Sequence, residues 1–79
     1  MVAKVTERQG QYLSFISQYM KLNGRSPAES DIQRYFDISP PTVHQMVVKL
    51  ENLGLITRQP GVARSIQVMV SPDGIPELK

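Results

Sequence analysis

The sequence predicts a mainly α fold with a small β-hairpin (α+β), and three observations lead to this class. Three segments place apolar residues three and four positions apart, which is the spacing of one helix face. Each segment starts at residues typical of helix N-termini. Two short runs with strand character then flank Gln59-Pro60-Gly61, which is a turn signal. A chain of 79 residues has room for one domain with a single core.

The first helix is expected from Glu7 to Leu22. Thr6 and Gln9 match a capping box, in which each side chain satisfies a free backbone amide at the start of the helix. Asn23-Gly24 supplies a left-handed stop. The apolar stripe of this helix, which we expect in the core, consists of Tyr12, Phe15, Ile16, Tyr19 and Met20.

The second helix is expected from Glu29 to Phe36, because acids in a first turn interact favourably with the helix dipole. Ser39 then caps a third helix that begins with Pro40 and Pro41, where the missing amides would have had no partner. The two prolines also prevent the second helix from continuing into the third. Residues 37–38 are therefore expected to form the turn of a helix-turn-helix.

The third helix is expected over residues 40–53, before Gly54, and has two distinct faces at about 100° per residue. The face expected in the core carries Val43, Met46, Val47, Leu50 and Leu53. The outer face and its flanks carry Pro41, Thr42, His44, Gln45, Val48, Lys49 and Asn52. This outer face is mostly uncharged but rich in hydrogen-bonding groups, unlike the Glu- and Lys-rich face of an ordinary solvated helix.

Strands are expected at residues 55–58 and within residues 63–70, and they frame a wing (residues 58–65). The only charges from Gly54 to Val70 are Arg58 and Arg64, with no acid between them. Three helices and a wing in this order predict a three-helix winged helix-turn-helix. We expect residues 1–70 to form this domain and residues 71–79 to be a flexible tail or linker remnant.

Composition excludes several classes of function. The chain has no cysteine, so disulfides and thiol chemistry are absent. It has one histidine, His44, with no second ligand beside it in the sequence, so we expect no metal, no cofactor, no small-molecule substrate and no enzyme activity. No apolar run approaches the ~20 residues of a membrane span. Because the N-terminal residues also lack a long apolar segment of signal-peptide type, we expect a cytoplasmic protein, nucleoid-associated if it binds DNA. A net charge of +2 favours an anionic partner.

The order of motifs resembles the amino-terminal DNA-binding domain of the LexA repressor family over residues 6–70. The matching pieces are Thr6-Glu7-Arg8-Gln9, Gly24-Arg25-Ser26-Pro27, Ile38-Ser39-Pro40, Leu53-Gly54-Leu55-Ile56 and Ala63-Arg64-Ser65-Ile66. The resemblance implies a transcriptional repressor that binds duplex DNA. It does not extend to the family's Ala-Gly cleavage site or its serine-lysine protease domain, so self-cleavage and the dimerisation provided by that domain are not carried over.

By position, the resemblance places base-reading residues at Ser39, Pro41, Thr42, His44 and Gln45, and wing contacts around Arg64, including Ser65. The residues at 41, 42, 44 and 45 differ from those typical of LexA, so the operator is not carried over. Chemically, Gln45 can bond adenine bidentately, and Thr42 or Val48 can contact the methyl group of thymine. His44 can donate to a phosphate or to guanine. Candidate phosphate contacts are Arg25, Lys49, Arg58 and Arg64, and Arg64 can alternatively enter the minor groove.

Two alternatives remain open from the sequence. Gln45 and Asn52 can be ordinary solvated side chains, and so can the two arginines of the wing. The domain can also be a protein-interaction module without DNA specificity of its own, with Val48 as an exposed anchor. If it binds DNA, a homodimer on DNA is a further expectation, because specific sites usually contain two half-sites.

Overall fold

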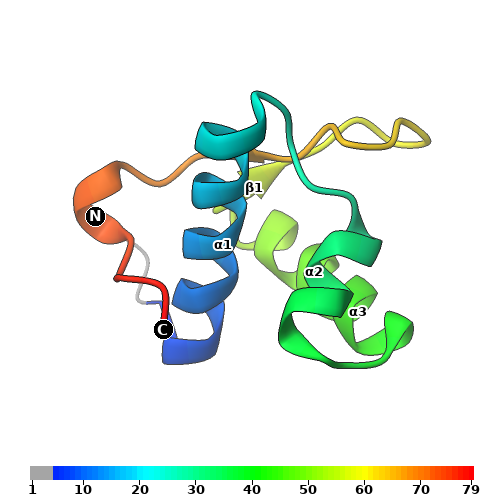
Figure 1. The fold of residues 1–79 in the computed structure, drawn as a ribbon, viewed down its shortest axis with the longest axis horizontal. Coiled ribbons are helices and arrows are strands. Elements are labelled where there is room, and N and C mark those ends of the chain that lie inside the picture. The colour runs from blue at the N-terminus through cyan, green and yellow to red at the C-terminus, as the bar shows by residue number, and fades with distance from the viewer. Residues whose placement is uncertain (1–4) are drawn as a thin grey trace.

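The computed structural model describes residues 5–79 and contains three α-helices, a two-stranded sheet and a short 3-10 helix (Figure 1). The elements are α1 (Glu7–Asn23), α2 (Glu29–Phe36), α3 (Pro40–Asn52), β1 (Ile56–Thr57), β2 (Gln67–Val68) and η1 (Pro72–Gly74). α1 stands between the C-terminal residues on one side and α2 and α3 on the other. The three helices and the hairpin confirm the predicted winged helix-turn-helix.

α1 begins and ends as the sequence predicts, within one residue. The Thr6 hydroxyl accepts from the Gln9 amide at 3.1 Å, and the Gln9 side chain accepts from the Thr6 amide at 3.1 Å. The C-cap is Gly24, whose φ of 70° is the left-handed conformation that glycine adopts without a steric penalty. The helix runs one residue past the expected Leu22 because Asn23 keeps helical geometry up to this cap.

The core lies where α1, α2, α3 and the hairpin meet. Its buried apolar members are Tyr12, Leu13, Phe15, Ile16, Ile32, Val43, Val47, Leu50, Leu55, Ile56 and Ile66. Aromatic stacking joins α1 to α2, with ring centroids 4.6 Å apart in both the Tyr12–Phe36 and the Phe15–Tyr35 pairs. One core assignment from sequence is wrong: Leu53 is 46% exposed because α3 ends one residue before it. Tyr35, at the rim of the aromatic cluster, is 45% exposed.

The turn between α2 and α3 reverses the chain in three residues. Asp37 ends α2 with a left-handed φ of 54°, a conformation that aspartate tolerates better than most residues. Ser39 then caps α3 in an extended conformation, and Pro40 and Pro41 occupy the first two helical positions as expected. Residues with restricted backbones therefore fix the direction in which α3 leaves α2.

The β-sheet is much shorter than the sequence predicts. β1 and β2 pair antiparallel through only Ile56↔Val68 and Thr57↔Gln67, with the Met69 amide donating to the Leu55 carbonyl at 2.8 Å. Residues between the strands form no further strand pairs, and several of them make side-chain hydrogen bonds instead. Arg64 adopts a left-handed φ of 56°. The strand expected within residues 63–70 therefore comprises two residues, Gln67 and Val68.

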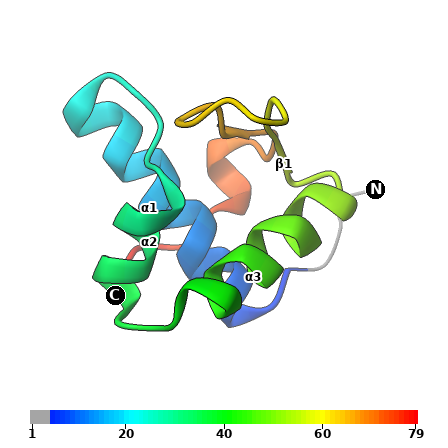
Figure 2. The same cartoon turned by 90° about the vertical axis from the view of Figure 1, so that its right-hand side faces the viewer.

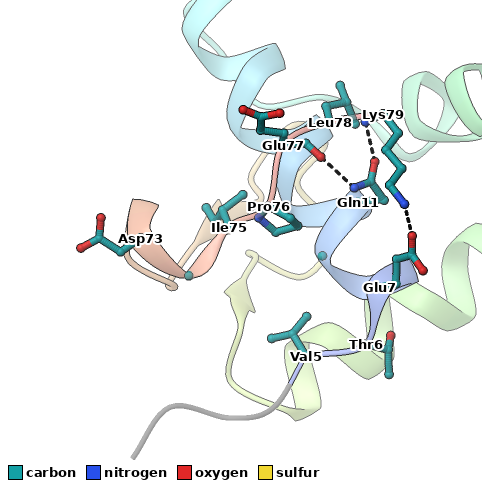
Figure 3. Close-up of a pocket in the computed structure, with 12 residues that line it drawn as sticks. Val5, Thr6, Glu7, Gln11, Asp73, Ile75, Pro76, Glu77, Leu78 and Lys79 are labelled. Atoms are coloured by element: carbon teal, nitrogen blue, oxygen red, sulfur yellow. Dashed lines mark hydrogen bonds and ion pairs between the residues drawn. The ribbon is translucent and has the colours of Figure 1, made fainter.

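The C-terminal residues lie against α1, whereas the sequence predicts a flexible tail from residue 71. The Gln11 side chain donates to the Glu77 carbonyl at 2.9 Å and accepts from the Lys79 amide at 2.8 Å (Figure 3). Lys79 also forms an ion pair with Glu7, and Leu78 packs on the core. Prolines and glycine in this segment form η1 and a bend that returns the chain to α1.

Candidate nucleic-acid interface

One face of the molecule carries both α3 and the wing. In Figure 2, α3 crosses the front of the molecule and the hairpin loop lies above it. α2 packs against α3 from the side, as expected for a helix-turn-helix pair. The predicted recognition helix and the wing are therefore available to one partner at the same time.

The outer face of α3 is exposed as the sequence predicts, with one exception. The exposed residues are Ser39, Pro41, Thr42, His44, Gln45, Lys49 and Asn52. Val48, the anchor that a protein-docking role requires, is only half exposed. Behind this face, Val43, Val47 and Leu50 are fully buried and hold the helix to the core.

The Ser39 hydroxyl already has partners within α3. It accepts from the Thr42 amide at 3.4 Å and lies 2.8 Å from the Thr42 hydroxyl. These interactions satisfy one free amide at the N-terminus of the helix. The two hydroxyls are exposed, so they form a joined polar surface at the end of α3 nearest the turn.

Glu29 connects the wing to α3. Its carboxylate lies 3.2 Å from His44 Nδ1 and accepts from the Arg58 guanidinium, also at 3.2 Å. Arg58 donates in addition to Glu51 of α3 at 3.2 Å. His44 has no acid beside it in the sequence, and the fold brings a carboxylate to it from fifteen residues away.

Arg64 bonds to groups of α1, α2 and the segment between them, and its side chain is 32% exposed. Its guanidinium donates to Asp31 at 2.9 Å, to the Tyr19 hydroxyl at 3.2 Å and to the Ser26 carbonyl at 3.4 Å. Asp31 also accepts from the Ala28 amide at 2.9 Å. The Ala28 amide, and then Arg64, lower the pKa of the Asp31 carboxyl below its ordinary value. The wing arginines have no acid near them in the sequence, but in the folded protein both Arg58 and Arg64 bond to carboxylates.

Ser65 organises the wing itself. Its hydroxyl accepts from the Gln59 amide at 2.9 Å and lies 2.9 Å from the Val62 carbonyl. The Val62 amide in turn donates to the Gln59 carbonyl at 3.1 Å, closing a turn in which Gly61 has a φ of 74°. The side chain of Ser65 therefore closes the loop from within.

Arg25 and Lys49 are the basic candidates that the fold leaves available. Both are exposed, and neither forms an ion pair with any residue in the described range 5–79. Arg25 follows the C-cap of α1, and Lys49 lies on the flank of α3. Within the same range, no group of three potential metal ligands occurs and no helix is long and apolar enough to cross a membrane.

Sequence reasoning missed five residues that contact His44 or the two wing arginines: Tyr19, Ser26, Glu29, Asp31 and Glu51. It placed Glu29 and Asp31 correctly at the start of α2 but gave them only a helix-dipole role. Their second role depends on packing between segments that are 29 and 33 residues apart. One signal was available in the sequence. Two acids lie at the start of the second helix, and the two arginines of the wing have no acid near them in the sequence.

Comparisons with known proteins point to one family. A family model described as the LexA DNA binding domain matches residues 2–65. The LexA repressor of Thermosipho melanesiensis is 40% identical over 72 residues, which cover 91% of this chain and 36% of that protein. The LexA repressor of Thermosipho africanus is 39% identical over 72 residues with the same coverage. That of Petrotoga mobilis is 40% identical over 67 residues, or 84% of this chain and 32% of the relative.

Proposed function

The chain belongs to the LexA DNA-binding domain family, and we propose on that premise that it reads duplex DNA through the outer face of α3 as part of a transcriptional repressor. An α-helix fits the major groove, where each base pair presents a distinct pattern of hydrogen-bond donors and acceptors. In helix-turn-helix docking the N-terminal residues of the second helix reach the base edges.

The observation that supports this assignment best is the first half of α3. Thr42, His44 and Gln45 are exposed and uncharged or weakly charged, whereas Val43 and Val47 next to them are fully buried. A reading surface needs side chains that are available to bases and a backbone that does not move. This half of α3 has both, because the prolines at its start and the core behind it restrict the helix.

We assign separate roles to the remaining candidates. Gln45 and Thr42 read bases, with Pro41, Val48 and Asn52 shaping the contact surface around them. Arg25 and Lys49 contact phosphates, because they are exposed and have no ion pair within residues 5–79. Arg58, Arg64 and Ser65 act on DNA chiefly by holding the wing beside α3, since each of them already bonds to other residues of the fold.

Repression and pairing on DNA are proposals about a larger assembly. The chain spans about a third of the length of the curated relatives it matches, and those relatives are named repressors. One α3 covers a single half-site, so we propose that two copies bind half-sites about one helical turn apart. Sedimentation of the protein with duplexes carrying one or two half-sites, selected from a random pool, measures that stoichiometry.

The direct test is a substitution at Gln45. Gln45→Ala should weaken binding to a selected site by about 1 to 3 kcal/mol while leaving binding to random duplex unchanged. Fluorescence anisotropy across a salt series measures both affinities and the salt slope.

Gln18→Ala is the matched control, because Gln18 is also exposed but lies on α1, where it lines a pocket together with Ile75, Pro76 and Glu77. It should leave both affinities unchanged. Salt-independent binding by the wild-type protein, or an equal loss in the two variants, would contradict the proposal.

A further inference from the structure

We infer that Glu29 sets the hydrogen-bonding character of His44, so that His44 presents a hydrogen-bond acceptor to the DNA and reads a base that carries an amino group. Glu29 is thus a positioning residue for base recognition, acting from α2 on a residue of α3. The inference rests on the proposed function and specifies the chemistry of one of its contacts.

The geometry at His44 defines which ring nitrogen is occupied. Nδ1 lies 3.2 Å and 3.3 Å from the two carboxylate oxygens of Glu29. The His44 side chain is 57% exposed, and Nε2 has no hydrogen-bond partner among residues 5–79. Since the two nitrogens lie on different sides of the imidazole ring, engaging Nδ1 leaves Nε2 free for a ligand.

The chemistry of the partner decides where the proton lies. An ionised carboxylate only accepts hydrogen bonds, so the nitrogen that faces it must carry a proton. Neutral imidazole has one N–H and one bare nitrogen, and the bond made by one nitrogen fixes the role of the other. Facing Glu29, neutral His44 therefore holds its proton on Nδ1 and exposes Nε2 as an acceptor.

This assignment selects a class of base. In the major groove, adenine N6 and cytosine N4 are donors, whereas guanine and thymine offer acceptors at N7, O6 and O4. An acceptor at Nε2 matches the amino groups of adenine and cytosine. It meets the guanine acceptors unfavourably, in contrast to the sequence expectation that His44 donates to guanine or to a phosphate.

Arg58 holds the Glu29 carboxylate in place. Its NH1 donates to Glu29 Oε2 at 3.2 Å, and its Nε donates to Glu51 at 3.2 Å. The Arg58 side chain is only 26% exposed, so its orientation is restricted by packing. Glu51 contacts Arg58 but not His44, which makes it the matched control for Glu29: both substitutions remove one carboxylate from the same arginine.

The first experiment observes the ring directly in the free protein. His44 is the only histidine, so a long-range proton–nitrogen correlation spectrum contains one imidazole pattern. Under conditions where the spectrum shows a neutral ring, the wild type and Glu51→Ala should show the Nδ1–H tautomer. Glu29→Ala should move the proton toward Nε2, the form that free histidine side chains favour in water. An Nε2–H tautomer in the wild type would overturn the inference.

The second experiment reads the consequence on DNA. Binding sites are selected from a random pool of duplexes with the wild type and with His44→Ala. The base pair contacted by residue 44 is the one at which the wild type shows a sequence preference and His44→Ala shows none. Every base pair has one amino group on its major-groove edge, on adenine or on cytosine. At this pair, replacing that base by its analogue without the amino group (purine for adenine, 2-pyrimidinone for cytosine) should weaken binding of the wild type and Glu51→Ala by about threefold to tenfold, the strength of one hydrogen bond. Glu29→Ala should lose less than about twofold.

The results separate the two proposals. An unchanged wild-type affinity after the amino group is removed, or the same loss of affinity in Glu29→Ala, would overturn the role of Glu29 even though DNA binding is intact. Failure of the wild type to select any duplex would overturn the proposed function itself. The tautomer measurement needs no DNA, so its result stands apart from that failure.

Discussion

Asp31 carries two interactions that a single side chain rarely combines in so short a helix. Its carboxylate accepts from the Ala28 amide, which caps α2, and from Arg64, which brings the wing to the same helix. Both interactions favour the charged form, and they lower the pKa of the Asp31 carboxyl. Asp31 therefore links a local capping interaction to the placement of a distant loop.

The lowered pKa of Asp31 predicts a pH dependence of stability. A carboxyl whose pKa is lower in the folded state stabilises the fold at any pH above its unfolded value of about 3.9. That contribution is lost as the pH falls through the lower folded value. Asp31→Asn should cost about 1 kcal/mol at pH 7, and this difference from wild type should vanish toward pH 2. Thermal unfolding from pH 2 to 7 measures it, and a difference independent of pH would contradict the assignment.

At the scale of elements, the wing is attached more by side chains than by its sheet. Two residue pairs join β1 to β2, whereas Arg64 bonds to groups from α1, α2 and the segment between them. Arg58 adds contacts to α2 and α3. The position of the wing relative to α3 therefore depends on ion pairs and hydrogen bonds, and we expect it to respond to substitutions at these arginines.

Replacing Arg64 separates an internal role from a DNA contact. Arg64→Met keeps most of the apolar stem but removes the donors to Asp31 and Tyr19, so it should lower the melting temperature. Each phosphate contact contributes about 0.9 to the slope of log affinity against log salt concentration. The slope for Arg64→Met should therefore differ from the wild-type slope by less than about half of that amount. A slope reduced by a full contact would show that Arg64 binds phosphate.

Arg25→Met is the matched comparison and should give the opposite pattern. Arg25 is exposed and has no ion pair within residues 5–79, so its loss should change stability by less than about 0.5 kcal/mol. If Arg25 contacts phosphate as proposed, the salt slope should fall by about 0.9. Unfolding and anisotropy measurements on the same two samples decide between the roles, and an unchanged slope would remove Arg25 from the interface.

At the scale of the whole molecule, the C-terminal segment closes one side of α1. Gln11 is largely buried and bonds to the backbone of that segment through both ends of its amide. A Cβ added at Gly10 would lie 2.8 Å from the Pro76 ring, so the segment approaches α1 closely there. The absence of a side chain at residue 10 is part of what makes this approach sterically feasible.

Gln11→Ala should release the C-terminal segment without changing α3. Losing two hydrogen bonds should lower the free energy of unfolding by about 1 to 3 kcal/mol. Hydrogen exchange should lose protection at the Lys79 amide, which donates to Gln11, while the amides of α3 keep theirs. The Gln18→Ala variant should retain the wild-type exchange pattern. Equal exchange rates at Lys79 in wild type and Gln11→Ala would contradict the role of Gln11.

The contrast between local and distant interactions explains what could be predicted from the sequence. The capping box at Thr6, the left-handed stop at Gly24 and the proline start of α3 depend on neighbours within a few residues, and all three are confirmed. The partners of Arg58 and Arg64 and the two-residue strands depend on how the wing packs against the helices. Packing of this kind leaves no periodic pattern in one sequence, so the carboxylates behind the site could not be identified.

The carboxylate shared by α3 and the wing also has a consequence for how this domain can change its specificity. If His44 alone is replaced, Glu29 keeps its arginine but faces a side chain that does not complement it. New preferences at residue 44 should therefore arise together with substitutions at residue 29, as a pair that varies jointly during evolution. A library built to retarget α3 should randomise both positions at once, because variants drawn from either position alone would miss the compatible combinations.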